Sequence, residues 1–146
     1  MAKKIMIVSK EHDTHFILGS ALLTHGYSVS PAHNDREAVQ IIKKDNFELF
    51  ILDASKDVNV KKLTKVFRTD NKLRDIPVII LCSQKHNKHT IDAWDAGADY
   101  CFSEPFIIEE VVGIIKSMLV VREAKITDKL LLKDENFLIP RLCPST

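Results

Sequence analysis

Hydrophobic residues form short continuous runs along the chain, and several segments between the runs place hydrophobic residues at helical spacing. Such runs are typical of strands in a parallel sheet, because both faces of the strand are then buried and must be apolar. They predict strands at residues 5–8, 49–53, 76–81 and 100–103, and we also expect a short second strand at residues 27–30, which is not a continuous run. Pro77 falls at the start of the fourth strand, where it removes no hydrogen bond from the sheet.

The intervening segments predict five helices, at residues 13–25, 34–44, 60–67, 90–96 and 107 to about 121. In the first helix we expect the inward stripe to consist of Phe16, Ile17, Ala21 and Leu22. Gly26 supplies a stop after this helix, because glycine adopts the left-handed conformation that commonly ends a helix. The alternation of strands and helices predicts an α/β domain in which right-handed crossovers place helices on both faces of a parallel sheet.

Composition narrows the class of protein. The chain has 146 residues, of which 45% are hydrophobic and 28% charged, as expected for one globular domain. Its 21 basic and 20 acidic residues give a net charge of +1, so the charge balance predicts no nucleic-acid or membrane partner. The first residues are too short an apolar run for a signal peptide. Three cysteines without metal-ligand spacing favour reduced thiols in a cytoplasm, and hence a cytoplasmic protein.

Asp53 is the candidate functional residue, because it directly follows the apolar run Leu49–Leu52. An aspartate at that position lies at the carboxyl edge of the sheet, where open α/β sheets bind their ligands. One alternative for such a fold is a flavodoxin-like nucleotide or flavin binder. The first strand, however, is followed by Ser9-Lys10-Glu11 and no glycine-rich loop, so backbone amides are not arranged to hold a phosphate in the usual way.

The order and spacing of several motifs resemble the receiver domain of two-component response regulators, a chemotaxis-type (CheY-like) family. The resemblance covers about residues 4–121. The matching segments are Lys4-Ile5-Met6-Ile7-Val8, His25-Gly26-Tyr27, Phe50-Ile51-Leu52-Asp53, Asp75-Ile76-Pro77-Val78-Ile79-Ile80-Leu81, Ala96-Gly97-Ala98-Asp99 and Pro105-Phe106. It implies a flavodoxin-like (βα)5 three-layer sandwich with a five-stranded parallel sheet of order 2-1-3-4-5.

The resemblance implies a phosphorylation switch. In the family, the third-strand aspartate, here Asp53, attacks a phosphohistidine and becomes an acyl phosphate. Two acidic residues after the first strand hold Mg²⁺ with it, and a Thr or Ser after the fourth strand and a Lys before the fifth-strand proline hold the phosphoryl oxygens. These groups are needed because phosphoryl transfer depends mainly on positioning and on neutralising oxygen charge.

This sequence keeps the nucleophile and changes its helpers. The acid-pair positions hold Ser9 and Lys10, the Thr/Ser position holds Cys82, and the lysine position holds Glu104. Two further positions belong to this degenerate switch site: Ser83, which follows Cys82, and Cys101, which replaces the family's fifth-strand aromatic with Tyr100 one place earlier. We therefore expect a pseudo-receiver without a metal or other cofactor, which acts through protein–protein contacts and is not an enzyme.

Charge suggests what replaces the metal. The formal charges of Lys10, Asp53 and Glu104 sum to −1. Our hypothesis is that Lys10 occupies the place of the metal and pairs with Asp53, Glu104 or both. The main alternative is a working phosphoacceptor in which Glu11 and Asp13 form a residual acidic site that holds Mg²⁺ with Asp53.

The last predicted helix carries more apolar surface than a core-facing stripe needs. Its flank contributes Ile107, Ile114 and Val121 to a candidate interface with Trp94 and Tyr100. The resemblance implies partners in a histidine-kinase pathway or another signalling protein, and a homodimer through the last two helices and the fifth strand. Alternatively, this flank packs under the preceding helix or under leucines of the tail.

The alternation of strands and helices stops after the last predicted helix. We therefore divide the chain into a receiver-like domain, residues 1–122, and a C-terminal tail or linker, residues 123–146.

Overall fold

The computed structural model describes residues 2–55, 57–82 and 97–133, the last five of them by backbone alone. It contains one five-stranded parallel sheet of order β2-β1-β3-β4-β5, as the family resemblance implies. The strands are β1 (Lys4–Val8), β2 (Ser28–Ala32), β3 (Leu49–Asp53), β4 (Val78–Cys82) and β5 (Tyr100–Ser103). Each strand begins and ends within two residues of its predicted bounds.

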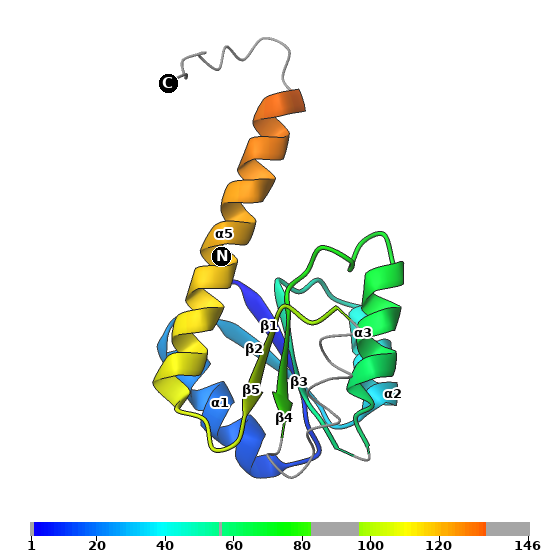
Figure 1. The fold of residues 1–146 in the computed structure, drawn as a ribbon, viewed down its shortest axis with the longest axis vertical. Coiled ribbons are helices and arrows are strands. Elements are labelled where there is room, and N and C mark those ends of the chain that lie inside the picture. The colour runs from blue at the N-terminus through cyan, green and yellow to red at the C-terminus, as the bar shows by residue number, and fades with distance from the viewer. Residues whose placement is uncertain (1, 56, 83–96, 134–146) are drawn as a thin grey trace.

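Four helices are described: α1 (His12–Thr24), α2 (Asp35–Ile42), α3 (Val60–Thr69) and α5 (Ile108–Lys133). Helices α1 and α5 cover one face of the sheet, and α2 and α3 cover the other (Figure 1). The three layers confirm the predicted flavodoxin-like sandwich. The helix predicted at residues 90–96 lies outside the described residues.

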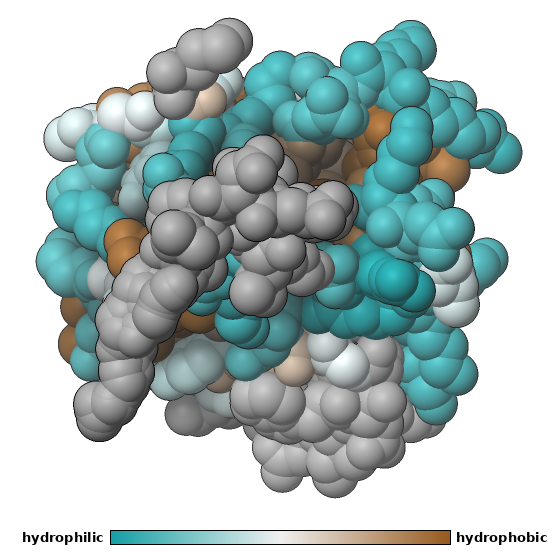
Figure 2. Space-filling view, turned by 90° about the horizontal axis from the view of Figure 1, so that it is seen from above, coloured by the Kyte–Doolittle hydropathy of each residue, from teal (hydrophilic) through white to brown (hydrophobic). Residues whose placement is uncertain are grey.

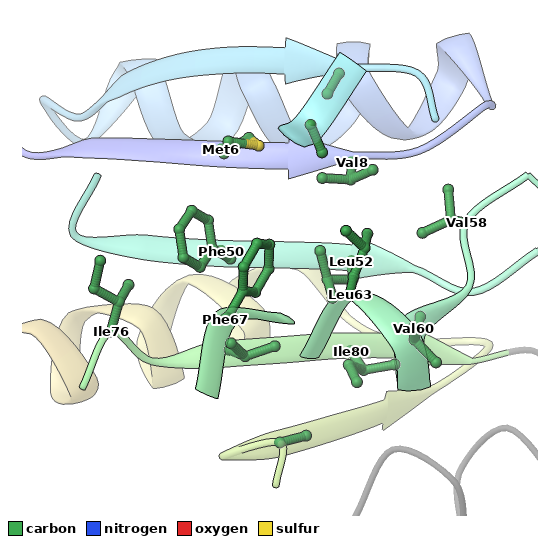
Figure 3. Close-up of a cluster of buried hydrophobic side chains, with 14 of the residues drawn as sticks. Met6, Val8, Phe50, Leu52, Val58, Val60, Leu63, Phe67, Ile76 and Ile80 are labelled. Atoms are coloured by element: carbon green, nitrogen blue, oxygen red, sulfur yellow. The ribbon is translucent and has the colours of Figure 1, made fainter. Parts of the chain in front are cut away.

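Alternate residues of each strand pack into two cores, one on each face of the sheet. On the α2/α3 face, Met6, Phe50 and Ile80 meet Leu63 and Phe67 (Figure 3), and the rings of Phe50 and Phe67 stack with centroids 4.3 Å apart. The core on the α1/α5 face is built from the intervening strand residues together with Leu18, Leu22, Val111, Val112, Ile115 and Leu119. Burial on both faces explains why the strands read as continuous apolar runs.

Helix α1 turns a different side to the sheet from the one predicted. Phe16 and Ile17 are 73% and 49% exposed, whereas Leu18 and Leu22 are buried together with Gly19. The prediction was wrong for Phe16 and Ile17 and correct for Leu22 and Ala21, which pack in or against the core. Residues 16–18 are all apolar, so their periodicity fits more than one stripe. Only the packing of the helix beside β2 and α5 selects Leu18 as the inward residue.

Helix α5 is longer than predicted. It continues to Lys133, beyond the expected end near Val121, and extends past the edge of the sheet at which the strands begin (Figure 1). An ion pair of 3.0 Å between Lys3 Nζ and Glu123 Oε2 joins this extension to the chain just before β1. None of the helices in the described part of the chain is long and apolar enough to cross a membrane.

Candidate functional site

Asp53 ends β3 at the carboxyl edge of the sheet, where the loop after β1 passes beside it. Val8 pairs with Leu52, so the following residues, Ser9 and Asp53, leave the sheet side by side. Ser9 is fully buried, and its backbone N–H donates to the carbonyl of Ala32 over 2.9 Å. The register of two central strands therefore fixes which residue meets the aspartate.

Two hydroxyl groups bind the Asp53 carboxylate. Ser9 Oγ donates to Asp53 Oδ2 over 2.7 Å, and Thr14 Oγ1 donates to the same oxygen over 3.2 Å. Ser9 Oγ also accepts the Glu11 backbone N–H over 3.0 Å, which fixes the entry into α1. We call Ser9 and Thr14 the hydroxyl clamp. Ser9 was expected at this site only as a lost metal ligand, and Thr14 was not predicted, because its role depends on where the first turn of α1 lies.

The pKa of Asp53 is raised above its ordinary value. The largest cause is burial, which disfavours the charged carboxylate, and the nearby charge of Glu11 acts in the same direction. The hydroxyl clamp and the charge of His15 oppose the shift by stabilising the carboxylate. Asp53 is thus a half-buried acid whose charged form depends on neutral donors.

Lys10 does not take the place of the metal. Its side chain is exposed and pairs with Asp57 at 3.9 Å, and among the described residues it forms no ion pair with Asp53 or Glu104. The pairing hypothesis is therefore wrong. Ser9 is the residue that turns inward at the end of β1, which leaves its neighbour directed to solvent. Glu104 is also exposed, and its backbone N–H donates to the carbonyl of Cys82 over 2.7 Å.

The residues around Asp53 do not fit Mg²⁺. Glu11 and Asp13, the predicted residual acidic site, are both exposed on the first turn of α1 and its entry. Over the ranges that the structure describes, no three His, Cys, Asp or Glu side chains gather closely enough to hold a metal ion. Mg²⁺ requires a shell of oxygen ligands, usually including carboxylates. Here one oxygen of the single central carboxylate is already bonded to two hydroxyls.

The two cysteines of the predicted switch positions have different surroundings. Cys82 is buried at the end of β4, whereas Cys101 is half-buried in β5 and packs against the α2/α3 core. Burial and the neighbouring Cys82 raise the pKa of Cys101 to about 12, which makes its thiol a poor nucleophile. Tyr100 lies on the opposite face of β5, with its ring 4.8 Å from that of Phe102. Ser83 lies outside the described residues.

Three histidines gather beside the hydroxyl clamp, although the sequence showed no histidine pair at a site. The ring of His33 lies 5.0 Å from that of His15 and 5.9 Å from that of His12. His15 Nε2 donates to the carbonyl of Ser9 over 2.7 Å, and its Nδ1 is buried with no hydrogen-bond partner. His33 Nδ1 bonds to Glu37 over 3.0 Å. These bonds help to fix the Ser9 backbone and thereby the clamp.

Of the predicted interface residues, Tyr100 and Ile114 line one groove, and Ile107 and Val121 are exposed. Ile107 and Val121 are 55% and 51% exposed, Tyr100 is 37% exposed, and Ile114 is half-buried. A groove of about 470 Å³ runs between β5 and α5, and Tyr100, Gly113 and Ile114 contribute to its lining. Trp94 lies outside the described residues.

Known proteins share this sequence pattern and fold. Residues 5–116 match the response regulator receiver domain family. "Probable transcriptional regulator ycf29" of Porphyra purpurea is 30% identical over 120 residues, which cover 82% of this chain and 57% of that protein. "Response regulator MprA" of Mycobacterium ulcerans is 26% identical over 129 residues, which cover 88% of this chain and 54% of that protein. The chain thus spans little more than half the length of these two relatives.

The fold has close counterparts among solved structures. A crystal structure from Chloroflexus aurantiacus, described as a response regulator, superposes with a TM-score of 0.76 at 26% sequence identity. The match covers 82% of this chain and 99% of that one. Given the sheet order, the aspartate at the end of β3 and the match over residues 5–116, the chain belongs to the response regulator receiver domain family of two-component signalling.

Proposed function

We propose that this receiver domain signals through protein–protein contacts with Asp53 held in one state, and that it does not undergo metal-dependent phosphorylation. The observation that carries this proposal is the hydroxyl clamp. Ser9, which stands at an acid-pair position of the family, and Thr14 both donate hydrogen bonds to Asp53 Oδ2. The carboxylate is thus stabilised by neutral donors that are part of the fold.

Charge around Asp53 supports the same proposal. A phosphoryl group adds about −1.5 to −2 charges at neutral pH, which the family balances with Mg²⁺ and a lysine. Here Glu104 stands in the lysine position, and Lys10 is directed to solvent with Asp57. The described residues offer the phosphoryl oxygens no cation, so transfer loses the charge stabilisation that a metal would supply.

The alternative is a working phosphoacceptor that uses Mg²⁺ held by Glu11 and Asp13. One observation favours it: the charge of Glu11 acts on Asp53, so the two carboxylates lie close enough to interact. Recruiting a metal there would require the exposed Glu11 and Asp13 side chains to turn toward Asp53 and the hydroxyl clamp to release Oδ2.

Treatment with a small phosphodonor separates the two functions. The chain is incubated with acetyl phosphate and Mg²⁺ and its mass is measured, with Asp53→Asn as the control. The proposal predicts no Mg²⁺-dependent mass gain. Phosphorylation that requires Mg²⁺ and disappears in Asp53→Asn would establish the phosphoacceptor instead. A variant with Ser9→Asp, Lys10→Asp and Glu104→Lys restores the family's charges and is expected to gain the modification if the fold tolerates it.

We also propose the kinds of protein that this domain contacts. Receiver domains interact with histidine kinases and other signalling proteins, and we propose that this one also pairs with a second copy of itself through β5 and α5. Exposed Tyr100, Ile107 and Val121 support this, because apolar side chains on an exposed surface commonly mark an association site. Sedimentation should show a concentration-dependent dimer that Ile107→Lys weakens and the exposed α1 substitution Phe16→Lys does not. A monomer at all concentrations would contradict the pairing.

The remaining expectations concern the larger protein. The predicted absence of a nucleic-acid partner lacks support, because one relative is named a transcriptional regulator and the chain covers little more than half of it. We propose that residues 1–122 form the receiver unit and that residues from 123 onward lead away from it, beginning with the extension of α5. The sparse cysteines of the sequence, which lack metal-ligand spacing, support the proposal of a reducing cytoplasmic location.

A further inference from the structure

A second cavity lies at the opposite edge of the sheet from Asp53. Its volume is about 420 Å³, within the range of small-molecule sites. One wall comes from the segment before β4 and the turn before β5, including Pro77 and Asp99. The other wall is the part of α5 from Ser117 to Ile126, all of which lies past residue 116, where the family match ends. The end of the predicted helix and the first part of its extension therefore form this wall together.

One nitrogen of an arginine that lines this cavity lacks a hydrogen-bond partner. Arg122 lines the cavity, and its Nε is buried without a hydrogen-bond acceptor. A buried guanidinium N–H is costly to leave unpaired, so an acceptor that enters the cavity would bind there favourably. Lys125, one turn further along α5, adds a second positive charge to the lining.

The acidic residues of the cavity are already engaged. Asp99 Oδ2 accepts from Arg68 over 2.7 Å and from the backbone N–H of Val78 over 2.7 Å. Asp75 also has an interaction partner. The polar group that the lining leaves unsatisfied is therefore cationic, and it favours an anion with at least two acceptor oxygens, since a guanidinium binds a carboxylate through two parallel hydrogen bonds.

The remaining wall is apolar. Pro77, Met118, Val121 and Ile126 line the cavity, and Val121 and Ile126 are 51% and 45% exposed. In Figure 2, which looks onto this end of the molecule, hydrophobic residues show in patches between predominantly hydrophilic ones. An apolar ligand body would cover these side chains while its anionic group reached Arg122.

We propose that this cavity binds a small amphipathic anion, an aromatic or short-chain carboxylate, between the receiver body and the extension of α5. The carboxylate pairs with Arg122, and the hydrocarbon part packs on Met118, Val121 and Ile126. Because one wall belongs to the body and the other to α5, the ligand holds the extension in a fixed direction. The site is separate from Asp53, so it supplies the domain with an input that does not require phosphate.

Binding can be followed with 1-naphthoate as the probe, by amide NMR shifts of the full chain. We expect saturable shifts in residues 75–78 and 117–126, and at least tenfold weaker binding to Arg122→Gln. The uncharged 1-naphthamide should also bind at least tenfold more weakly, since it lacks the second acceptor oxygen and the charge. Lys61→Gln, an exposed change on α3, serves as the matched control and should leave binding unchanged.

Two further variants keep the proposal testable if Arg122→Gln disturbs the helix. Ile126→Asn lies beyond the core, so it should weaken binding without changing thermal stability. Asp53→Asn should leave naphthoate binding intact, which separates this site from the proposed function. Shifts that scatter over exposed Phe16 and Leu23 of α1, an absence of saturation, or equal affinity in Arg122→Gln would each overturn the proposal.

Discussion

The hydroxyl of Ser9 lies 2.7 Å from Asp53 Oδ2 and donates its proton to that oxygen. The same hydroxyl accepts the Glu11 N–H at the entry to α1. One buried side chain thus stabilises the carboxylate and positions the helix that carries Thr14. This link explains how the site stays ordered with a serine in the position of a metal ligand.

Ser9→Ala should lower the unfolding free energy by about 1.5–3 kcal/mol at pH 7, since it removes a buried hydrogen bond to a charged group. It should also raise the pKa of Asp53 further, because the charged form loses a donor. Urea unfolding and an NMR titration of the Asp53 carboxyl measure the two effects. Ser20→Ala, at an exposed position of α1, should change neither, and an unaltered pKa in Ser9→Ala would contradict the clamp.

Asp53→Asn should stabilise the fold at neutral pH. The pKa of Asp53 is higher in the folded protein than in the unfolded chain, so ionisation disfavours folding, and the protein loses stability as pH rises through the folded pKa. The amide cannot ionise, and the gain should vanish as pH falls below about 4, where the aspartate is protonated in both states. Unfolding curves from pH 3 to 7 test this, with exposed Asp128→Asn as the control.

Lys10→Gln should change the unfolding free energy by less than about 1 kcal/mol, because its exposed pair with Asp57 is solvated. It should also leave the pKa of Asp53 unchanged, which carboxyl NMR can measure. A marked rise of that pKa in the variant would instead indicate that the Lys10 ammonium stabilises the Asp53 carboxylate.

Arg68→Ala should destabilise the protein by about 1.5–3 kcal/mol. The guanidinium joins α3 to the chain before β4, through the carbonyls of Arg74 and Ile76, and to the turn before β5, through the Gly97 carbonyl and Asp99. Hydrogen exchange should accelerate at Val78, the first residue of β4. Lys65→Ala, an exposed change on the same helix, should have little effect, and equal losses in both variants would contradict this role.

Two phenylalanine substitutions test the packing of the helices. Phe67 is fully buried against Phe50, so Phe67→Ala should cost about 3–5 kcal/mol. Phe16 is 73% exposed, and Phe16→Ala should cost less than about 0.5 kcal/mol. Urea unfolding of the two variants provides the comparison. A large loss in Phe16→Ala would support the helix stripe that the periodicity first suggested.

The hydrophobic pattern marks the central strands of this protein. Runs such as Leu49–Leu52 are apolar without interruption because the strands are buried on both faces, and no other element requires that pattern at this length. The same runs place Asp53 at the carboxyl edge of the sheet. The family motifs further identify which positions the switch would use.

Tertiary structure decided the details of the site. The sequence places Lys10 next to Ser9, and only the packing of the loop between β1 and α1 determines that Ser9 turns inward and Lys10 outward. The same packing brings Thr14 to Asp53 and His15 to the carbonyl of Ser9. Side-chain direction in a loop has no period that a sequence could reveal. Summing formal charges could not show which residue pairs with Lys10, because that depends on distances that only the folded chain provides.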